Sequence, residues 1–166
     1  SEAASRAGIT AKVHVKVDTG LHRFGLALDA AVNLAEALRQ LPGIEVEGLT
    51  THMANADEAN DAFADEQHAR FRAAVVRLPW IPYLHTANSA TALRREELRY
   101  SGVRIGLALH GVLPPNTPGP HLRPILALRA PSDKVVLTPA GQSRGRKTPV
   151  HVRDPGHVLT PRRGGT

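Results

Sequence analysis

The order of apolar and polar positions divides the first hundred residues into alternating strands and helices. Val13, Val15 and Val17 alternate with polar residues and predict a strand. Segment 28–41 has apolar residues at helical spacing and ends before a Pro-Gly pair, so it is predicted to be a helix. The same criteria predict strands at 44–51, 81–86 and 100–106, and helices at 57–78 and 91–97.

This alternation is typical of an α/β protein with a parallel sheet and right-handed crossovers. Four βα units amount to half of a complete (β/α)8 barrel. The predicted fold class is therefore a partial TIM-like barrel over residues 1–113.

The pattern changes after the fourth unit. Residues 114–122 are rich in proline and read as a linker, and 123–141 are strand-like, as at the start of a β domain. Residues 142–166 show no period of 2 or 3.6 and little apolar surface, which predicts a disordered tail. This abrupt change of composition also suggests a frameshift within the coding sequence.

Charge and composition narrow the function. Most of the net charge of +6 belongs to residues 141–166, which hold 6 Lys and Arg against 1 Asp, whereas residues 1–140 hold 15 Lys and Arg against 14 Asp and Glu. A body without a basic stripe and with 4% aromatic residues predicts no nucleic-acid partner. The chain has no cysteine and no apolar run that could span a membrane, which predicts a cytoplasmic protein.

Polar residues of catalytic types follow each predicted strand. In barrels the active site is built at the carboxyl ends of the strands, so these residues are expected to meet at one end. His52, His68 and His85 lack metal-ligand spacing, and no metal is predicted. The strand-end residues are Asp18, Arg23, His52, His85, Asn88, Ser89, Arg104 and Gly106.

Five stretches resemble the alanine racemases. They are KVDTGLHRFG, GLTTHMANADE, HTANSAT, VRIGLALHGVLP and LRPILALRA followed by VVLTPAG. The resemblance covers roughly residues 10–143 and implies a TIM-like barrel plus a β domain. It also implies pyridoxal 5′-phosphate (PLP) as cofactor and the interconversion of L-alanine and D-alanine through a PLP aldimine.

The resemblance implies a role for each matched residue. Arg23 would bind the substrate carboxylate, and Lys16 would occupy a position that is often carbamylated. His52 would lie against the pyridine ring and Arg104 would face its nitrogen. Ser89, with backbone N–H groups near Gly106 and Leu107, would bind the phosphate, and Asn88 would be a further cofactor-binding residue.

Both catalytic bases of the family are missing. The lysine that links to PLP precedes the KVDTG motif in the family, and none of Lys12, Lys16, Lys134 and Lys147 has its sequence context. Arg146 occupies the position of the tyrosine base, and His110 replaces a usual tyrosine. The prediction is a truncated, inactive fragment with no catalytic residue.

Other interpretations stay open. The retained motifs do not read the substrate side chain, so a serine or broad-specificity racemase is an alternative. A non-catalytic remnant that binds phosphate-bearing ligands or a partner is another. The family is homodimeric, and a fragment is not expected to dimerise normally. Individually, Arg23 could be a loop arginine, Lys16 an exposed strand lysine, His52 a structural histidine and Asn88 a helix cap.

Overall fold

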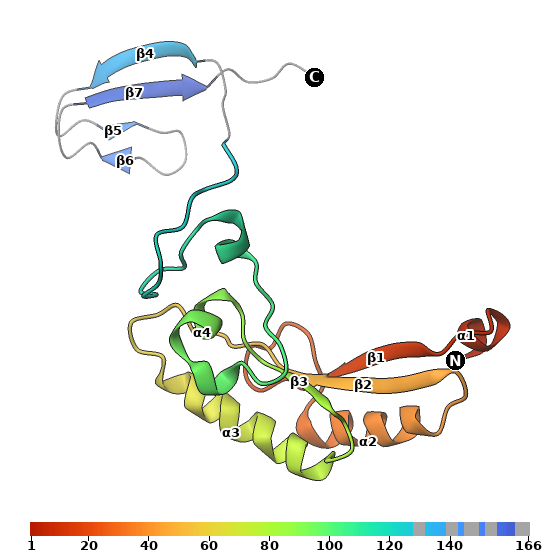
Figure 1. Ribbon diagram of the computed structural model, residues 1–166. Coiled ribbons are helices and arrows are strands. Elements are labelled where there is room, and N and C mark those ends of the chain that lie inside the picture. Colours follow the sequence, from red (N-terminus) through yellow and green to blue (C-terminus); the bar gives the residue numbers. More distant parts are fainter. Residues whose placement is uncertain (128–131, 139–142, 145–149, 152–155, 162–166) are drawn as a thin grey trace. The chain divides into compact units, whose positions relative to one another are not determined.

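The computed structural model describes residues 1–127, 132–138, 143–144, 150–151 and 156–161 (Figure 1). The chain divides into two units, Ser1–Ile125 and Leu126–Thr166. No helix in the described part is long and apolar enough to cross a bilayer.

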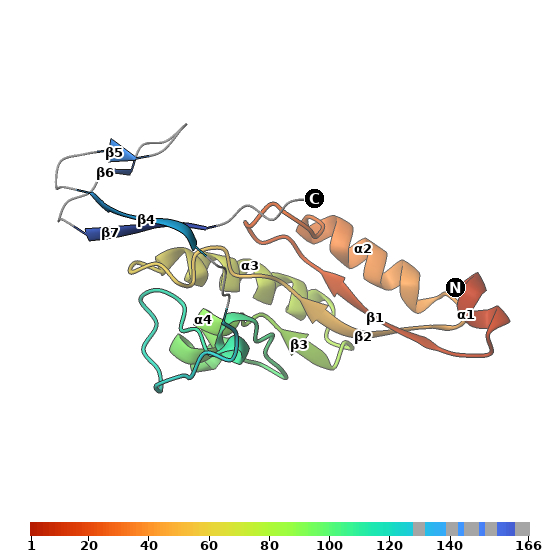
Figure 2. The ribbon, with the colours of Figure 1, turned by 90° about the horizontal axis from the view of Figure 1, so that it is seen from above.

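The first unit is built on a three-stranded parallel sheet in the order β1-β2-β3. Each strand is followed by a helix, and α2 and α3 cover the same face of the sheet (Figures 1 and 2). The short helix α1 precedes the sheet. The elements are α1 (Glu2–Arg6), β1 (Ala11–Lys16), α2 (Leu28–Arg39), β2 (Ile44–Thr50), α3 (Ala62–Arg77), β3 (Tyr83–His85) and α4 (Ser89–Arg94).

The core lies between the sheet and the two helices. The valines of β1 point into it, as the alternation predicts, and Phe71 of α3 fills its centre. Its buried members are Val15, Val17, Ala31, Val32, Ala35, Val46, Leu49, Phe71, Ala74, Leu78 and Ile81. The opposite face of the sheet carries the polar partners of the alternation, among them Lys12, His14 and Glu47.

Helix α3 begins four to five residues later than its pattern predicts. The carbonyl groups of Ala56 and Glu58 accept hydrogen bonds from Arg94, and that of Asp57 accepts one from Asn116. These long-range bonds hold the segment as a loop, so the helix begins only after Asp61.

The prediction of a fourth strand at 100–106 is wrong. This segment hydrogen-bonds to the end of β3 at two points, Ser101 N to Leu84 O (2.9 Å) and Arg104 N to Ala87 O (2.9 Å). The segment begins with a turn in which Tyr100 has a positive φ (51°). This turn interrupts the pairing, so no ladder of strand hydrogen bonds forms with β3. The predicted helix at 91–97 is divided into α4 and a 3-10 turn, Glu96–Leu98, and a second 3-10 turn spans Leu107–His110.

The second unit contains two antiparallel strand pairs. β4 (Ser132–Thr138) pairs with β7 (Gly156–Pro161), and β5 (Ser143–Arg144) pairs with β6 (Val150–His151). Three of these strands therefore fall inside the tail for which composition predicts disorder. The other tail residues, including Arg146 and Lys147, lie outside the described residues, and the domain boundaries stay a prediction.

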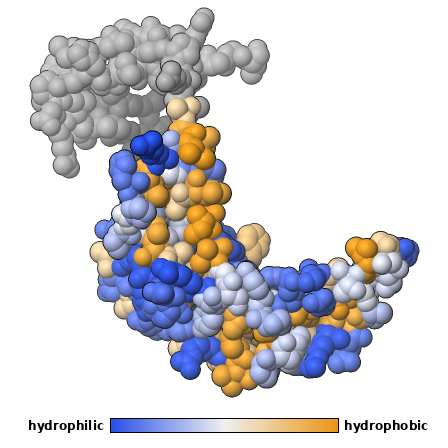
Figure 3. Space-filling model, viewed as in Figure 1, coloured by the Kyte–Doolittle hydropathy of each residue, from blue (hydrophilic) through white to orange (hydrophobic). Residues whose placement is uncertain are grey.

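We expect the first unit to be only marginally stable by itself. In the described part β1 has a strand partner on one side only, and Figure 3 shows apolar surface over the segment after α4. Its exposed large apolar side chains are Val103, Ile105, Leu107, Leu109, Val112 and Ile125. Calorimetry should give a broad transition at or below about 45 °C, the low end for mesophilic domains. A sharp transition of a monomer well above that range would contradict the expectation.

Candidate functional site

Arg104 is the centre of the polar residues at the carboxyl end of the sheet. One terminal nitrogen, Nη1, donates to Thr50 Oγ1 (3.0 Å) and to the ring Nδ1 and carbonyl of His85. The other, Nη2, donates to the carbonyls of Thr51 (2.7 Å) and Thr86 (3.1 Å). Burial lowers the pKa of Arg104, which still remains a cation at neutral pH. The guanidinium is thus fixed by protein acceptors at both terminal nitrogens.

Two histidines beside Arg104 are held in the neutral form. Burial lowers the pKa of His52 to about 4, with further contributions from the charges of Arg104, Arg23 and Lys16. Burial also lowers the pKa of His85 to about 4, followed by the effects of Arg104 and His14. At pH 7 both imidazoles are therefore uncharged, and Arg104 provides the positive charge at this point.

Ser89 brings one further hydrogen-bond donor to the site. Its buried hydroxyl oxygen accepts hydrogen bonds from Gly106 N (3.0 Å) and Ala108 N (3.4 Å). Among the described residues the hydroxyl donates to no acceptor, so its hydrogen remains available to a ligand. Asn88 is the N-cap of α4, because its Oδ1 accepts from Thr91 N (3.0 Å). The capping interpretation of Asn88 is thereby confirmed.

Arg104 and Ser89 line one cavity of about 250 Å³. Gly106 leaves open space at this point, since a Cβ added there would meet nothing within 4 Å. The full lining is His52, Asp57, Asn88, Ser89, Ala90, Arg104, Gly106, Leu107 and Pro114. All six residues to which the sequence assigns a cofactor-binding role therefore line the same cavity.

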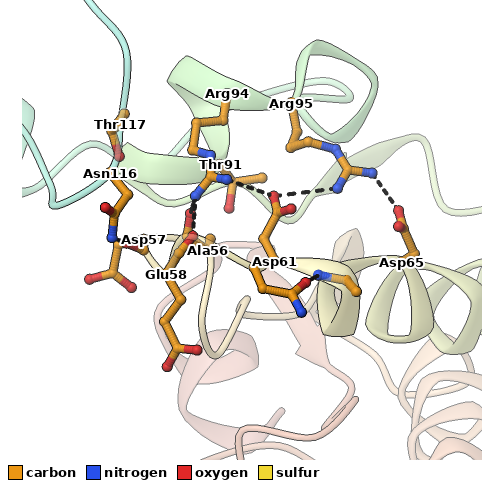
Figure 4. Close-up of polar contacts among 12 residues, drawn as sticks. Ala56, Asp57, Glu58, Asp61, Asp65, Thr91, Arg94, Arg95, Asn116 and Thr117 are labelled. Atoms are coloured by element: carbon orange, nitrogen blue, oxygen red, sulfur yellow. Dashed lines mark hydrogen bonds and ion pairs between the residues drawn. The ribbon is translucent and has the colours of Figure 1, made fainter.

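The loop that carries Asp57 to the cavity is fixed from α4 (Figure 4). Arg94 Nη1 donates to the carbonyls of Ala56 (2.9 Å) and Glu58 (2.6 Å), on either side of Asp57. Asp61, at the end of the loop, makes ion pairs with Arg94 (3.6 Å) and Arg95 (3.5 Å). The rim of the cavity is therefore held in place by α4.

Arg23, Lys16 and Asp18 do not line this cavity. Arg23 is exposed, although its charge contributes to the lowered pKa of His52 and Lys16. Burial lowers the pKa of Lys16, whose ammonium lies 5.8 Å from the centre of the Phe24 ring. Asp18 closes its own turn by accepting from Gly20 N (3.0 Å). No group of three or more histidine or acidic side chains in the described part could hold a metal ion.

Known proteins resemble this chain in sequence and in fold. Residues 1–114 match the model of the alanine racemase N-terminal domain. The chain belongs to the alanine racemase family. An alanine racemase of Desulfovibrio desulfuricans is 39% identical over 147 residues, which are 85% of this chain and 40% of that protein. One of Nostoc is 34% identical over 142 residues, which are 83% of this chain and 33% of that protein.

Solved alanine racemases share the fold. The enzyme of Streptomyces coelicolor superposes with a TM-score of 0.69 at 30% identity, covering 95% of this chain and 44% of that one. The enzyme of Bacillus anthracis with bound L-Ala-P gives 0.66 at 26% identity, covering 95% and 45%. The predicted fold class, a partial TIM-like barrel, is thereby confirmed. The chain spans 40% and 33% of the length of these two curated relatives.

Sequence reasoning missed two parts of this candidate site. Gln67 of α3 is fully buried, and it accepts from Ala54 N (2.8 Å) while donating to Thr19 Oγ1 (3.0 Å) and His52 O (3.1 Å). It ties together the loops after β1 and β2. Its spacing among the apolar residues of α3 could have revealed it. The acceptors that fix Arg104 were also missed, because most are backbone carbonyls that no residue type discloses.

The lowered pKa of the two histidines predicts a loss of stability in acid. The unfolded chain binds their protons below about pH 6.5, whereas the folded chain binds them only near pH 4. The free energy of unfolding should therefore fall between these values, by about 1–2 kcal/mol per histidine once solvent screening is allowed for. Two-dimensional NMR of the histidine rings measures both pKa values. Titration of either ring near 6.5 in the folded chain would contradict the prediction.

Proposed function

We propose that this chain is the cofactor-holding part of a PLP-dependent alanine racemase and lacks its two bases. The observation that supports the proposal is the meeting of the Ser89 hydroxyl and the Arg104 guanidinium in one cavity. The hydroxyl can donate a hydrogen bond to an anion, and the guanidinium can donate one to an aromatic nitrogen. Bound PLP supplies an electron-withdrawing ring that stabilises the charge left when the α-proton of an amino acid is removed.

The donors at the cavity suit the two polar ends of PLP. The hydrogen of the Ser89 hydroxyl would donate to the phosphate, while the oxygen of that hydroxyl is held by the N–H groups of Gly106 and Ala108. Arg104 uses both terminal nitrogens on protein acceptors, and its Nε–H makes no hydrogen bond within the described residues. This Nε–H is the donor we assign to the pyridine nitrogen. A permanently charged donor there discourages protonation of the ring.

The same cavity lacks both residue types that the family uses to move the α-proton. Its lining contains neither lysine nor tyrosine, and neutral His52 lies beside Arg104. Lys16 lies outside the lining with a lowered pKa. The chain would therefore bind and orient the cofactor without removing the α-proton, which is the truncated and inactive state expected from the sequence.

Substrate and partner follow from the family. We propose alanine as the amino acid of the parent enzyme, with Arg23 as the carboxylate ligand supplied from the loop after β1. No described residue of the cavity selects between alanine and serine, so a serine or broad-specificity racemase remains the alternative within this chemistry. The cytoplasmic location, the carbamylation of Lys16 and impaired dimerisation stay predictions.

Ligand binding to matched serine variants tests the proposal. Ser89→Ala removes the free hydroxyl of the cavity. Ser101→Ala also removes a hydroxyl that accepts a backbone N–H (Leu84 N, 3.1 Å), but outside the cavity. We expect Ser89→Ala to weaken PLP binding about 10-fold, the value of one hydrogen bond to a charged group. Pyridoxal without phosphate should be unaffected.

Fluorescence titration of the chain with PLP and with pyridoxal gives both affinities. Ser101→Ala should bind both ligands like the unmodified chain. Equal affinity of the unmodified chain for PLP and pyridoxal would contradict the proposed phosphate site.

A further inference from the structure

A row of hydrogen bonds crosses the polar face of the sheet and ends at Arg104. Lys12 Nζ donates to Glu47 Oε1 (2.7 Å), and Glu47 Oε2 lies 3.2 Å from His14 Nε2. His14 Nδ1 lies 2.7 Å from His85 Nε2, and His85 Nδ1 contacts Arg104 Nη1. The row joins β1, β2 and β3 to the guanidinium at the cavity.

The donor at one end of the row, Arg104, and the acceptor at the other end, Glu47, determine which ring nitrogens of His85 and His14 carry hydrogen. A guanidinium can only donate, so His85 Nδ1 must be unprotonated and its Nε2 must carry the hydrogen. That hydrogen needs an acceptor, which makes His14 Nδ1 unprotonated and places the His14 hydrogen on Nε2. Glu47, whose pKa is lowered chiefly by the hydrogen bond from Lys12, is then the anionic acceptor at the end.

Two glycines leave the space that the rings of His14 and Tyr83 occupy. A Cβ at Gly48 would lie 2.4 Å from His14 Nδ1, and one at Gly102 would lie 2.0 Å from the Tyr83 hydroxyl. The rings of His14 and His85 meet edge to face with centres 4.9 Å apart, and Tyr83 lies 5.7 Å from each. The row is therefore held by packing as well as by hydrogen bonds.

We propose that His14 and Glu47 are positioning residues that orient Arg104 through His85. This inference rests on the proposed contact of Arg104 with the pyridine nitrogen. With Nη1 directed to His85 and Nη2 to the carbonyls of Thr51 and Thr86, the guanidinium plane is fixed and Nε–H is left for the ligand. Without the row, the hydrogen of His85 could move to Nδ1, where it would oppose Arg104.

The charges around His85 support a neutral ring. It is faced by Arg104 from the segment after α4, by His14 from β1, by the Thr50 hydroxyl from β2 and by Tyr83 on its own strand. No carboxylate contacts it among the described residues. A proton added to His85 would therefore meet a cation and lose the acceptor that Arg104 uses.

Nitrogen-15 NMR of the ligand-free chain at pH 7 tests the row without any cofactor. The expected spectrum shows His85 and His14 both with hydrogen on Nε2 and bare Nδ1. His14→Phe keeps the ring shape but accepts nothing, so His85 should become a mixture of tautomers. His14→Gln restores an acceptor and a donor and should return His85 to the single tautomer. A protonated His85 Nδ1 in the unmodified chain would overturn the proposal.

A matched control uses a histidine that is hydrogen-bonded to a tyrosine elsewhere in the first unit. His68 Nε2 lies 2.7 Å from the Tyr100 hydroxyl, away from the row. Tyr100→Phe should change the His68 signals and leave those of His85 in place. His14→Phe should weaken binding of PLP and of pyridoxal alike, by about 3-fold to 10-fold, while Glu47→Gln should give a smaller effect of the same kind. Normal tautomers with no binding of either ligand would contradict the proposed function while leaving the row itself intact.

Discussion

The purified chain, supplied with PLP and L-alanine, should form no D-alanine above the rate of free PLP. The described cavity contains the residues to which we assign cofactor binding but no lysine or tyrosine to exchange the α-proton. Loss of one general acid–base group typically costs about 10²–10⁴-fold, and the proposal is that this chain lacks both. A coupled assay for D-alanine, run at several chain concentrations, measures the rate.

Arg104→Ala, purified in the same way, is the control for this assay. Activity equal in both proteins would identify a contaminating enzyme. Turnover that requires Arg104 would contradict the proposal, because another residue must then move the proton. Lys16, with its lowered pKa, and His110 are the residues to replace next.

Arg104→Met should cost the first unit about 3–5 kcal/mol in free energy of unfolding. The methionine keeps the length of the side chain, but the Thr50 hydroxyl and three backbone carbonyls each lose one donor, and His85 O keeps only the bond from Thr50 Oγ1 (2.8 Å). Breaking such a part-buried, charged network leaves acceptors that are shielded from water without a donor. Urea unfolding in the cold, followed by circular dichroism, measures the loss.

Arg39→Met is the matched control. Arg39 lies at the surface, 4.7 Å from the centre of the Trp80 ring, and makes a cation–π contact. We expect it to cost about 1 kcal/mol or less. Equal losses in the two variants would mean that the hydrogen bonds of Arg104 stabilise the fold no more than a surface cation–π contact does. That result would contradict the central position that we give to Arg104.

Local pattern was sufficient for the elements whose burial is regular. β1, α2 and β2 begin where the alternation and the helical spacing place them, because each buries one face against the same core. The start of α3 and the fourth strand could not be predicted this way. Arg94 and Asn116 decide the first by binding carbonyls that lie 36 to 59 residues away, and positive φ at Tyr100 decides the second.

The candidate site was likewise predictable only in part from local sequence pattern. Placing polar residues at strand ends predicted that Ser89, Arg104 and Gly106 would meet, since parallel strands end at one edge. It also placed Asp18 and Arg23 at that end, yet neither lines the cavity. The row from Glu47 to Arg104 depends on the contact between His14 and His85, 71 residues apart, which no local period encodes.

Borohydride treatment of the chain with bound PLP is the most direct test of the central claim, that the chain holds the cofactor without a covalent link. We expect a saturable change in PLP absorbance that is lost in Arg104→Ala and fully reversed by dialysis. After reduction, mass spectrometry should find Lys16 modified no more than Lys12, which lies on the sheet face with Glu47. A stoichiometric adduct on one lysine that requires Arg104 would contradict the claim.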